Sequence, residues 1–427
     1  MTGASLARSA ARWSAIGLRR LDVPGLLRVL GPAWVVMLAD VDAPSVLTAA
    51  QAGTQFGYAL LLPLVLLIPI LYLVQEMTAR LGVVTGMGHA ELLRERYGFG
   101  WAAAAVISMA GIDLLAYVAE FAGIVLGASI LGVPAWLAVA FALAFHTLTV
   151  LTASYRRFEQ VALALSLALF TFVVLAFTVH PNPGAMLGGL SLAQPVQNRS
   201  YLDLVVATIG AVIMPWMLFY QQAATVDKGL GVQDLRAART ETLVGAVASE
   251  LLMAAVVIAS AAAMAGHATG GPQGLADLPA GLARLATGAP AILIAVGMVG
   301  AGLLAAVVIS LSSAWAWAEL FRWPHSLNLS VRRAPLFYGL YLLEVVPAAL
   351  VALLARDLVT LIIDAMILNV VVLAIPLGFL VRLSGDRAVL GALANGPVRT
   401  AIAWGVTLGL LAMGTWSTLG AFGLLRP

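Results

Sequence analysis

Asp42-Ala43-Pro44-Ser45 interrupts an apolar segment near the start of the chain, and Ile213-Met214-Pro215-Trp216 interrupts a second apolar segment near its middle. A proline removes a backbone N–H and blocks the preceding turn of a helix. In lipid, the freed carbonyls persist only where they are buried in protein or line a cavity. Paired interruptions in two halves of a chain point to the substrate site of a transporter. The two stretches therefore predict a broken-helix transporter, and the carboxylate of Asp42 favours a cation as its cargo.

Composition supports a membrane protein. The chain has 427 residues, of which 62% are hydrophobic and 10% are charged, whereas about 25% of residues are charged in soluble domains. A spanning helix needs about 20 mostly apolar residues. We therefore expect an all-α membrane protein with about eleven transmembrane helices, over windows near 28–52, 57–79, 100–129, 133–153, 158–180, 200–226, 241–266, 288–320, 334–355, 358–381 and 399–424.

The positions of the two interruptions predict an internal repeat. Residues 1–427 are expected to form a single transmembrane domain, with repeat one over about 28–180, repeat two over about 200–381 and an extra helix over about 399–424. Each repeat then begins with a broken helix, helix 1 or helix 6. Because each repeat has an odd number of helices, the second is inverted relative to the first.

Basic residues predict the orientation. With the N-terminus in the cytoplasm, 19 of the 23 lysines and arginines fall on the cytoplasmic side, and the outer side receives only Arg199, Arg284, Arg356 and Arg426. This asymmetry follows the positive-inside rule. We expect an integral protein of the plasma (inner) membrane, and we attribute the net charge of +3 to topology and not to binding of nucleic acid.

The sequence offers no motif for catalysis. It contains no cysteine, which excludes disulfides and thiol chemistry. It also lacks a nucleophile triad, a phosphate-cradling glycine loop and a zinc motif. We therefore predict that the chain is not an enzyme and has no cofactor. Its predicted partners at this point are the lipid bilayer and a cation as substrate, with no nucleic acid.

Four groups at the interruptions are candidate metal ligands. Asp42 supplies a carboxylate at mid-membrane, where such groups are costly and face a cavity or a partner. Ser45 offers a neutral oxygen three residues later. Met214 precedes Pro215, and its thioether is a soft ligand that favours later transition metals. Unwinding before Pro215 is expected to free the carbonyl of Ala211.

Several stretches resemble the Nramp family of divalent metal transporters. The family's first helix resembles GPAW at 31–34, DAPS at 42–45 and QAGTQFGY at 51–58. Its loop after helix 2 resembles ARLGVVTG at 79–86, AEL at 90–92 and RERY at 94–97, and its helix 6 resembles GAVIMP at 210–215. In the family, an Asp, an Asn, a methionine sulfur and a helix-6 carbonyl hold the ion. The resemblance therefore implies Asp42, Ser45, Met214 and the Ala211 carbonyl as ligands, with Ser45 replacing the Asn.

The resemblance weakens at the positions linked to protons. Trp216 and Gln221 stand where the family has two histidines, and neither takes up a proton near neutral pH. Glu120 matches the second acid of the family's helix-3 pair, Tyr117 stands at the first, and Asp113 lies one turn earlier. The resemblance therefore implies that proton coupling is weakened or altered, with Glu120 and Asp113 as the proton candidates.

Other polar residues within the spans have less specific roles. Asp364 and Asn369 in helix 10 are candidates to approach the ion, because the family draws a helix-10 polar group towards it. Glu250 and Glu344 are expected to be acids of a polar network inside the bundle.

The leading hypothesis is a secondary transporter that imports Mn²⁺ or Fe²⁺ by alternating access. The retained Met214 favours this cargo, whereas Trp216 and Gln221 favour the alternative, an uncoupled Mg²⁺ carrier of the same family. A transporter of amino acids on the same architecture would need a cationic substrate, because Asp42 repels a carboxylate. A non-transporting membrane sensor is a further alternative, which the lack of any signalling domain disfavours.

Overall fold

Every regular element in the described part of the protein is a helix. The computed structural model describes residues 31–151, 154–264, 280–354 and 358–421. The arginines counted before residue 31, together with Arg356 and Arg426, lie outside these ranges. The helices are α3 Pro32–Ala39, α4 Ala43–Phe56, α5 Leu61–Thr85, α6 His89–Tyr97, α7 Phe99–Ile130, α8 Ala135–Leu151, α9 Tyr155–Leu169, α10 Thr171–Thr178, α11 Pro183–Gly189, α12 Arg199–Val212, α13 Pro215–Asp227, η1 Val232–Asp234, α14 Leu235–Met264, α15 Ala280–Leu285, α16 Gly288–Phe321, α17 Pro335–Leu343, α18 Val345–Leu354, α19 Leu358–Gly385, α20 Arg387–Leu390, η2 Gly391–Leu393 and α21 Pro397–Ala421.

The all-α membrane class is confirmed, but the predicted count of eleven spans is not. Within the described ranges, nine helices are long and apolar enough to cross a membrane, and the bent pair of α3 and α4 makes ten. The window predicted at 133–153 corresponds to α8, whose 17 described residues fall short of the roughly 20 that a span requires.

The first predicted interruption is a bend between α3 and α4. The two helices meet at an angle of 49°, and the non-helical residues are Asp40, Val41 and Asp42. Pro44 lies in the first turn of α4, where a missing N–H costs nothing because that N–H would lack a helical partner. The proline therefore starts the second half of the helix.

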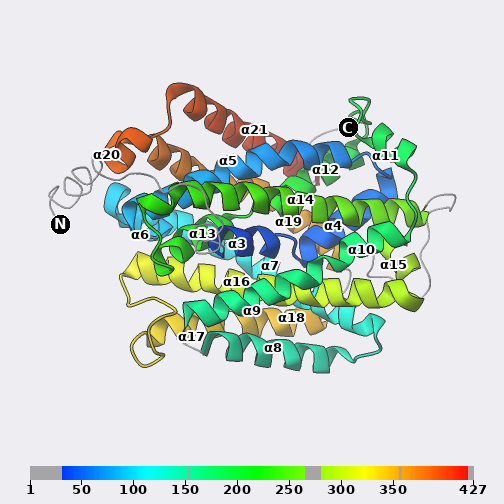
Figure 1. Ribbon diagram of the computed structural model, residues 1–427, viewed down its shortest axis with the longest axis horizontal. Helices are drawn as coiled ribbons and strands as arrows, with labels where there is room; N and C mark the ends of the chain where they lie inside the picture. The colour runs from blue at the N-terminus through cyan, green and yellow to red at the C-terminus, as the bar shows by residue number, and fades with distance from the viewer. Residues whose placement is uncertain (1–30, 152–153, 265–279, 355–357, 422–427) are drawn as a thin grey trace.

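The second interruption separates α12 from α13 at Ile213 and Met214, whose backbones are extended. Pro215 is the first residue of α13, so this proline starts a helix just as Pro44 does in the first turn of α4. In Figure 1, α3, α4 and α13 lie in the middle of the bundle, with long helices such as α14 and α16 on either side. Both interruptions are buried, so protein surrounds the unwound backbone, as the membrane requires.

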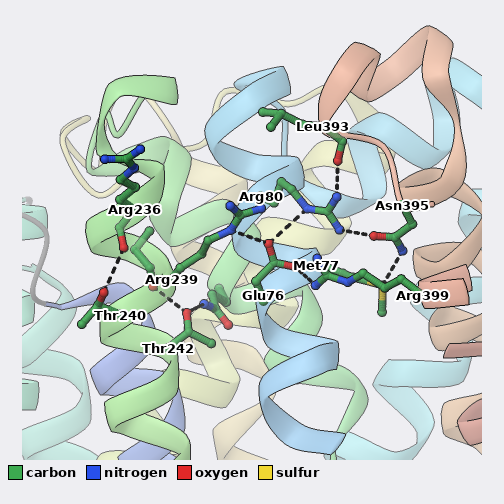
Figure 2. Close-up of polar contacts among 12 residues, drawn as sticks. Glu76, Met77, Arg80, Arg236, Arg239, Thr240, Thr242, Leu393, Asn395 and Arg399 are labelled. Carbon is green, nitrogen blue, oxygen red and sulfur yellow. Dashed lines mark hydrogen bonds and ion pairs between the residues drawn. The ribbon is translucent and has the colours of Figure 1, made fainter. Parts of the chain in front are cut away.

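A network of arginines around Glu76 joins α5, α14 and α21 at one end of the bundle (Figure 2). The Glu76 carboxylate accepts from Arg239 of α14 at 2.8 Å and from Arg399 of α21, and it lies 3.3 Å from the Nε atom of Arg80. Arg80 also donates to the Leu393 carbonyl and, at 2.6 Å, to Asn395. Three positive charges thus surround one buried carboxylate at this end.

Candidate functional site

Asp42 caps the first turn of α4 from inside the protein. Its side chain is fully buried, and its Oδ1 atom accepts a hydrogen bond from the Ser45 backbone N–H at 2.8 Å, the contact that an N-cap aspartate is expected to make. Its Oδ2 atom has no hydrogen-bond partner among the described residues. A buried carboxylate oxygen without a partner is energetically costly, so Oδ2 is available to a cation.

Ser45 connects the two interruptions. Its hydroxyl donates to the carbonyl oxygen of Ala211 across 3.2 Å, and both residues are completely buried. A serine hydroxyl that donates one hydrogen bond keeps its lone pairs, and a carbonyl oxygen that accepts one bond keeps a second lone pair. Hydrogen bonds therefore bring together three of the four predicted ligands, Asp42, Ser45 and Ala211.

Met214, the fourth predicted ligand, contacts Trp216 in the first turn of α13. Its sulfur accepts a hydrogen bond from the indole N–H of Trp216 at 3.2 Å. The backbone carbonyl of Trp216 in turn accepts from the Ser312 hydroxyl of α16 at 2.7 Å. Because the thioether is a weak acceptor with few alternatives in a buried site, a metal at this sulfur has to compete with the indole.

Glu120 of α7 reaches the first interruption. Its Oε2 atom accepts from the Ala43 backbone N–H at 3.1 Å, and its Oε1 atom has no hydrogen-bond partner in the described ranges. Glu120 and Asp42 thus flank the same unwound backbone. None of the ion pairs between described residues includes either acid. A mobile cation or a proton therefore has to balance their charge.

Asp113 lies in a separate cavity of about 270 Å³ beside α7, α16 and α17. It accepts from the Ser313 hydroxyl at 3.1 Å. Tyr117, which also lines the cavity, places its hydroxyl 2.8 Å from the Ser310 hydroxyl and 3.3 Å from the Glu344 carboxylate. Asp113, Tyr117 and Glu120 follow one another at helical spacing, so they share one face of α7.

Three further candidates, Gln221 of α13 and Asp364 and Asn369 of α19, occupy different surroundings. The Gln221 amide donates to Thr242 of α14 at 3.3 Å and is completely buried. Asp364 is exposed on α19. Asn369 of the same helix instead reaches the second interruption, where its amide donates to the carbonyls of Gly210 at 2.6 Å and Ile213 at 3.3 Å.

Three serines of α16 were not among the residues predicted for the site. Ser310, Ser312 and Ser313 contact Tyr117, Trp216 and Asp113 respectively. The signal available in the sequence was the cluster Ser310-Leu311-Ser312-Ser313 within an apolar helix of 34 residues. Serines in such helices are common partners for groups on neighbouring helices.

Two buried helix breaks that meet at a carboxylate, a hydroxyl and a carbonyl define a membrane transporter of the broken-helix class. The chain matches the family model for natural resistance-associated macrophage protein-like (Nramp) proteins over residues 33–419. It therefore belongs to the Nramp family.

Similar proteins are known by sequence and by structure. The divalent metal cation transporters MntH of Ralstonia nicotianae and of Mycobacterium tuberculosis are 30% and 29% identical to it over 402 residues, which cover 89% of this chain and 88% of each relative.

A crystal structure of the Eremococcus coleocola manganese transporter, in complex with an aromatic bis-isothiourea substituted compound, superposes with a TM-score of 0.77 at 19% identity and covers 97% of this chain and 92% of that one. A Na⁺-coupled sialic acid symporter superposes with a TM-score of 0.60 at 11% identity, covering 99% and 97%. These structural similarities concern the fold.

Proposed function

We propose that this chain transports divalent metal cations across the membrane. The observation that carries the proposal is the contact between the two helix breaks, where the Ser45 hydroxyl meets the Ala211 carbonyl beside the partly unsatisfied carboxylate of Asp42. Membership of the Nramp family and the similarity to MntH transporters support it. The protein acts as a carrier, not as an enzyme, and needs no resident cofactor.

Asp42, Ser45, the Ala211 carbonyl and Met214 form the proposed ligand set. Asp42 supplies the negative charge, and the two neutral oxygens replace part of the ion's hydration shell. A hydrogen bond already fixes Ser45 against Ala211, so these two ligands are positioned before the ion arrives. Binding through the sulfur of Met214 then requires the hydrogen bond from the Trp216 indole to this sulfur to break.

The leading cargo is Mn²⁺ or Fe²⁺. A thioether within the ligand set favours transition metals, because Mg²⁺ and Ca²⁺ take oxygen ligands. The alternating access that we propose moves the repeat over about 28–180 against the repeat over about 200–381. We further propose that the protein imports the ion into the cytoplasm through the plasma membrane. The distribution of lysine and arginine supports an orientation with the N-terminus inside.

A Mg²⁺ carrier without proton coupling is the second candidate. One contact favours it: the Trp216 indole occupies the sulfur of Met214, and without that sulfur the remaining ligands are all oxygen. Such a set suits Mg²⁺, which keeps several waters in its coordination shell. The absence of a titratable group at Trp216 and Gln221 is consistent with this alternative.

We propose that any proton transfer runs along α7. Glu120 touches the first helix break, and Asp113 lies two turns away on the same helix face, with Tyr117 between them. Glu120→Gln keeps an acceptor for the Ala43 N–H but removes the titratable group. The expected phenotype of this variant is metal uptake that continues while the small acidification of the lumen seen with the wild type disappears.

The deciding experiment is uptake of Mn²⁺ and Mg²⁺ into proteoliposomes that contain the full chain and an internal pH dye. We expect saturable Mn²⁺ uptake that Asp42→Asn abolishes, with little acidification. Undiminished uptake by Asp42→Asn would refute the site. Mg²⁺ uptake that excess Mn²⁺ does not inhibit would replace the leading cargo by the second candidate.

A further inference from the structure

A cavity of about 380 Å³ lies between α6, α19 and α21, and its lining includes no residue of the two helix breaks. In Figure 1, α6 and α20 are at the same end of the bundle, near the start of α21. The polar and aromatic side chains that line the cavity are Arg96, Tyr97, Arg382, Asp386, Thr400 and Trp404. Arg399, the neighbour of Thr400, turns away towards Glu76 (Figure 2).

The cavity has an excess of positive charge. Arg96 forms an ion pair with Asp386 at 2.8 Å, and the other oxygen of Asp386 accepts from the Ala388 backbone N–H at 2.8 Å. Both oxygens of this carboxylate are therefore engaged. Arg382 lies over the ring of Tyr97, 5.8 Å from its centroid, and takes part in no ion pair within the described residues. Its charge is thus available to an anion.

Aromatic side chains place this cavity at the membrane surface. Tyr97 and Trp101 both pack against Phe379, with ring centroids 5.5 Å and 5.7 Å apart, and Trp101 is 61% exposed. Tryptophan and tyrosine concentrate at the level of the lipid headgroups. On α21, next to the cavity, Val398 and Ile402 are 72% and 55% exposed, so apolar surface is available for acyl chains below a headgroup.

We propose that this cavity binds the phosphate group of an anionic phospholipid. Arg382 and Arg96 provide the charge, the Thr400 hydroxyl provides a neutral donor, and the exposed apolar side chains of α21 provide contact for the acyl chains. Basic pockets between transmembrane helices bind anionic headgroups in this way. The carboxylate of Asp386 is already paired with Arg96 and so leaves no free negative charge for a choline or ethanolamine group, and the cavity therefore prefers anionic over zwitterionic lipid. This site is independent of the proposed transport function.

The test measures which lipids stay with the purified full chain. The protein is reconstituted in nanodiscs of phosphatidylcholine and phosphatidylglycerol, extracted in mild detergent and analysed for the ratio of the two retained lipids. We expect wild type to enrich phosphatidylglycerol. Arg382→Gln is expected to reduce that enrichment about fivefold, the factor that one arginine near a lipid surface contributes, and Arg382→Lys is expected to keep most of it.

Arg387→Gln is the matched control, because Arg387 is an exposed arginine of α20 that does not line the cavity. Circular dichroism identifies any variant that fails to fold, and Arg382→Lys then decides. Loss of enrichment in Arg387→Gln equal to that in Arg382→Gln would overturn the proposal in favour of general surface charge. Displacement of the lipid by inorganic phosphate would overturn the choice of a lipid. Equal retention of both lipids by wild type would exclude the site.

Discussion

The hydroxyl of Ser45 donates a hydrogen bond to the carbonyl of Ala211 at 3.2 Å, and so joins the first turn of α4 to the last turn of α12. This bond spans 166 residues of sequence and links the two helix breaks directly. Because both residues are buried, the hydroxyl and the carbonyl each serve as a hydrogen-bond partner that water cannot replace.

Ser45→Ala should weaken metal binding without abolishing it. The substitution removes one neutral ligand and leaves the Ala211 carbonyl without this donor, a loss of about 1 kcal/mol. We therefore expect the apparent KM for Mn²⁺ uptake in proteoliposomes to rise about fivefold. Ser249→Ala is the control, because Ser249 is equally buried but bonds only within α14. An unchanged KM in Ser45→Ala would remove this residue from the ligand set.

Two substitutions at Asp42 should separate its roles as ligand and helix cap. Asparagine caps helices as well as aspartate does, whereas alanine costs about 1 kcal/mol at such a position. Both Asp42→Asn and Asp42→Ala should lose uptake, because both lack the charge. Only Asp42→Ala should also lower the thermal unfolding temperature in detergent. Equal destabilisation by the two variants would contradict the capping role.

Trp216→Phe should increase the preference for Mn²⁺ over Mg²⁺. Phenylalanine keeps an aromatic ring but lacks the N–H that occupies the sulfur of Met214, so the sulfur becomes available to a soft metal. Competition between the two ions for uptake measures this preference, and we expect a shift of about fivefold, the value of one hydrogen bond.

Met214→Leu provides the matched control for that shift. It should lower the preference for Mn²⁺, and Trp216→Phe should then have no further effect, because the two residues act through one contact. Additive effects in the double variant would show that Trp216 acts elsewhere.

Asn369→Ala should destabilise the second helix break. The Asn369 amide donates to the carbonyls of Gly210 and Ile213, and the loss of a buried donor costs about 1–3 kcal/mol. Thermal unfolding in detergent should show this loss, together with reduced uptake. Leu368→Ala, an exposed position on the same helix, should have little effect. Asn369→Ala with wild-type stability would refute the role of this amide.

The case of α19 illustrates what could be predicted from sequence. The unusual residue types at the breaks, Asp42, Pro44, Met214 and Pro215, are visible directly, because a polar or helix-breaking residue stands out against an apolar background. The choice between Asp364 and Asn369 is different. A membrane helix is apolar towards both lipid and protein, so its hydrophobic pattern carries little information on which face is buried. Only packing places Asn369 against the break and leaves Asp364 exposed.

Contacts between side chains were equally beyond the sequence. The hydrogen bond from Trp216 to Met214 depends on side-chain rotamers, and Ser312 meets Trp216 from a helix 96 residues later in the chain. The count of eleven spans was not confirmed, for a different reason. The apolar window predicted at 133–153 reaches residues 152 and 153, which lie outside the described part of the chain, and its described helix covers only Ala135–Leu151.

His89 should make the stability of the protein dependent on pH. It lies in α6, outside the spans, and burial lowers its pKa from 6.5 to about 4. Its Nδ1 atom must carry the proton, because it faces Oε1, the side-chain amide oxygen of Gln222, at 2.9 Å. Between pH 6.5 and 4 the unfolded chain binds a proton at this residue and the folded protein does not, so the free energy of unfolding falls as the pH falls through this range.

His89→Gln should therefore flatten the dependence of the unfolding temperature on pH between about 6.5 and 4, because glutamine cannot bind the proton. Uptake between pH 6.5 and 8 should keep its pH profile in this variant, since His89 is already neutral there. The measurement is thermal unfolding of wild type and variant over this pH range, with His325→Gln as the control, because His325 is only partly buried. An unchanged slope in His89→Gln would show that His89 takes up its proton in the folded protein.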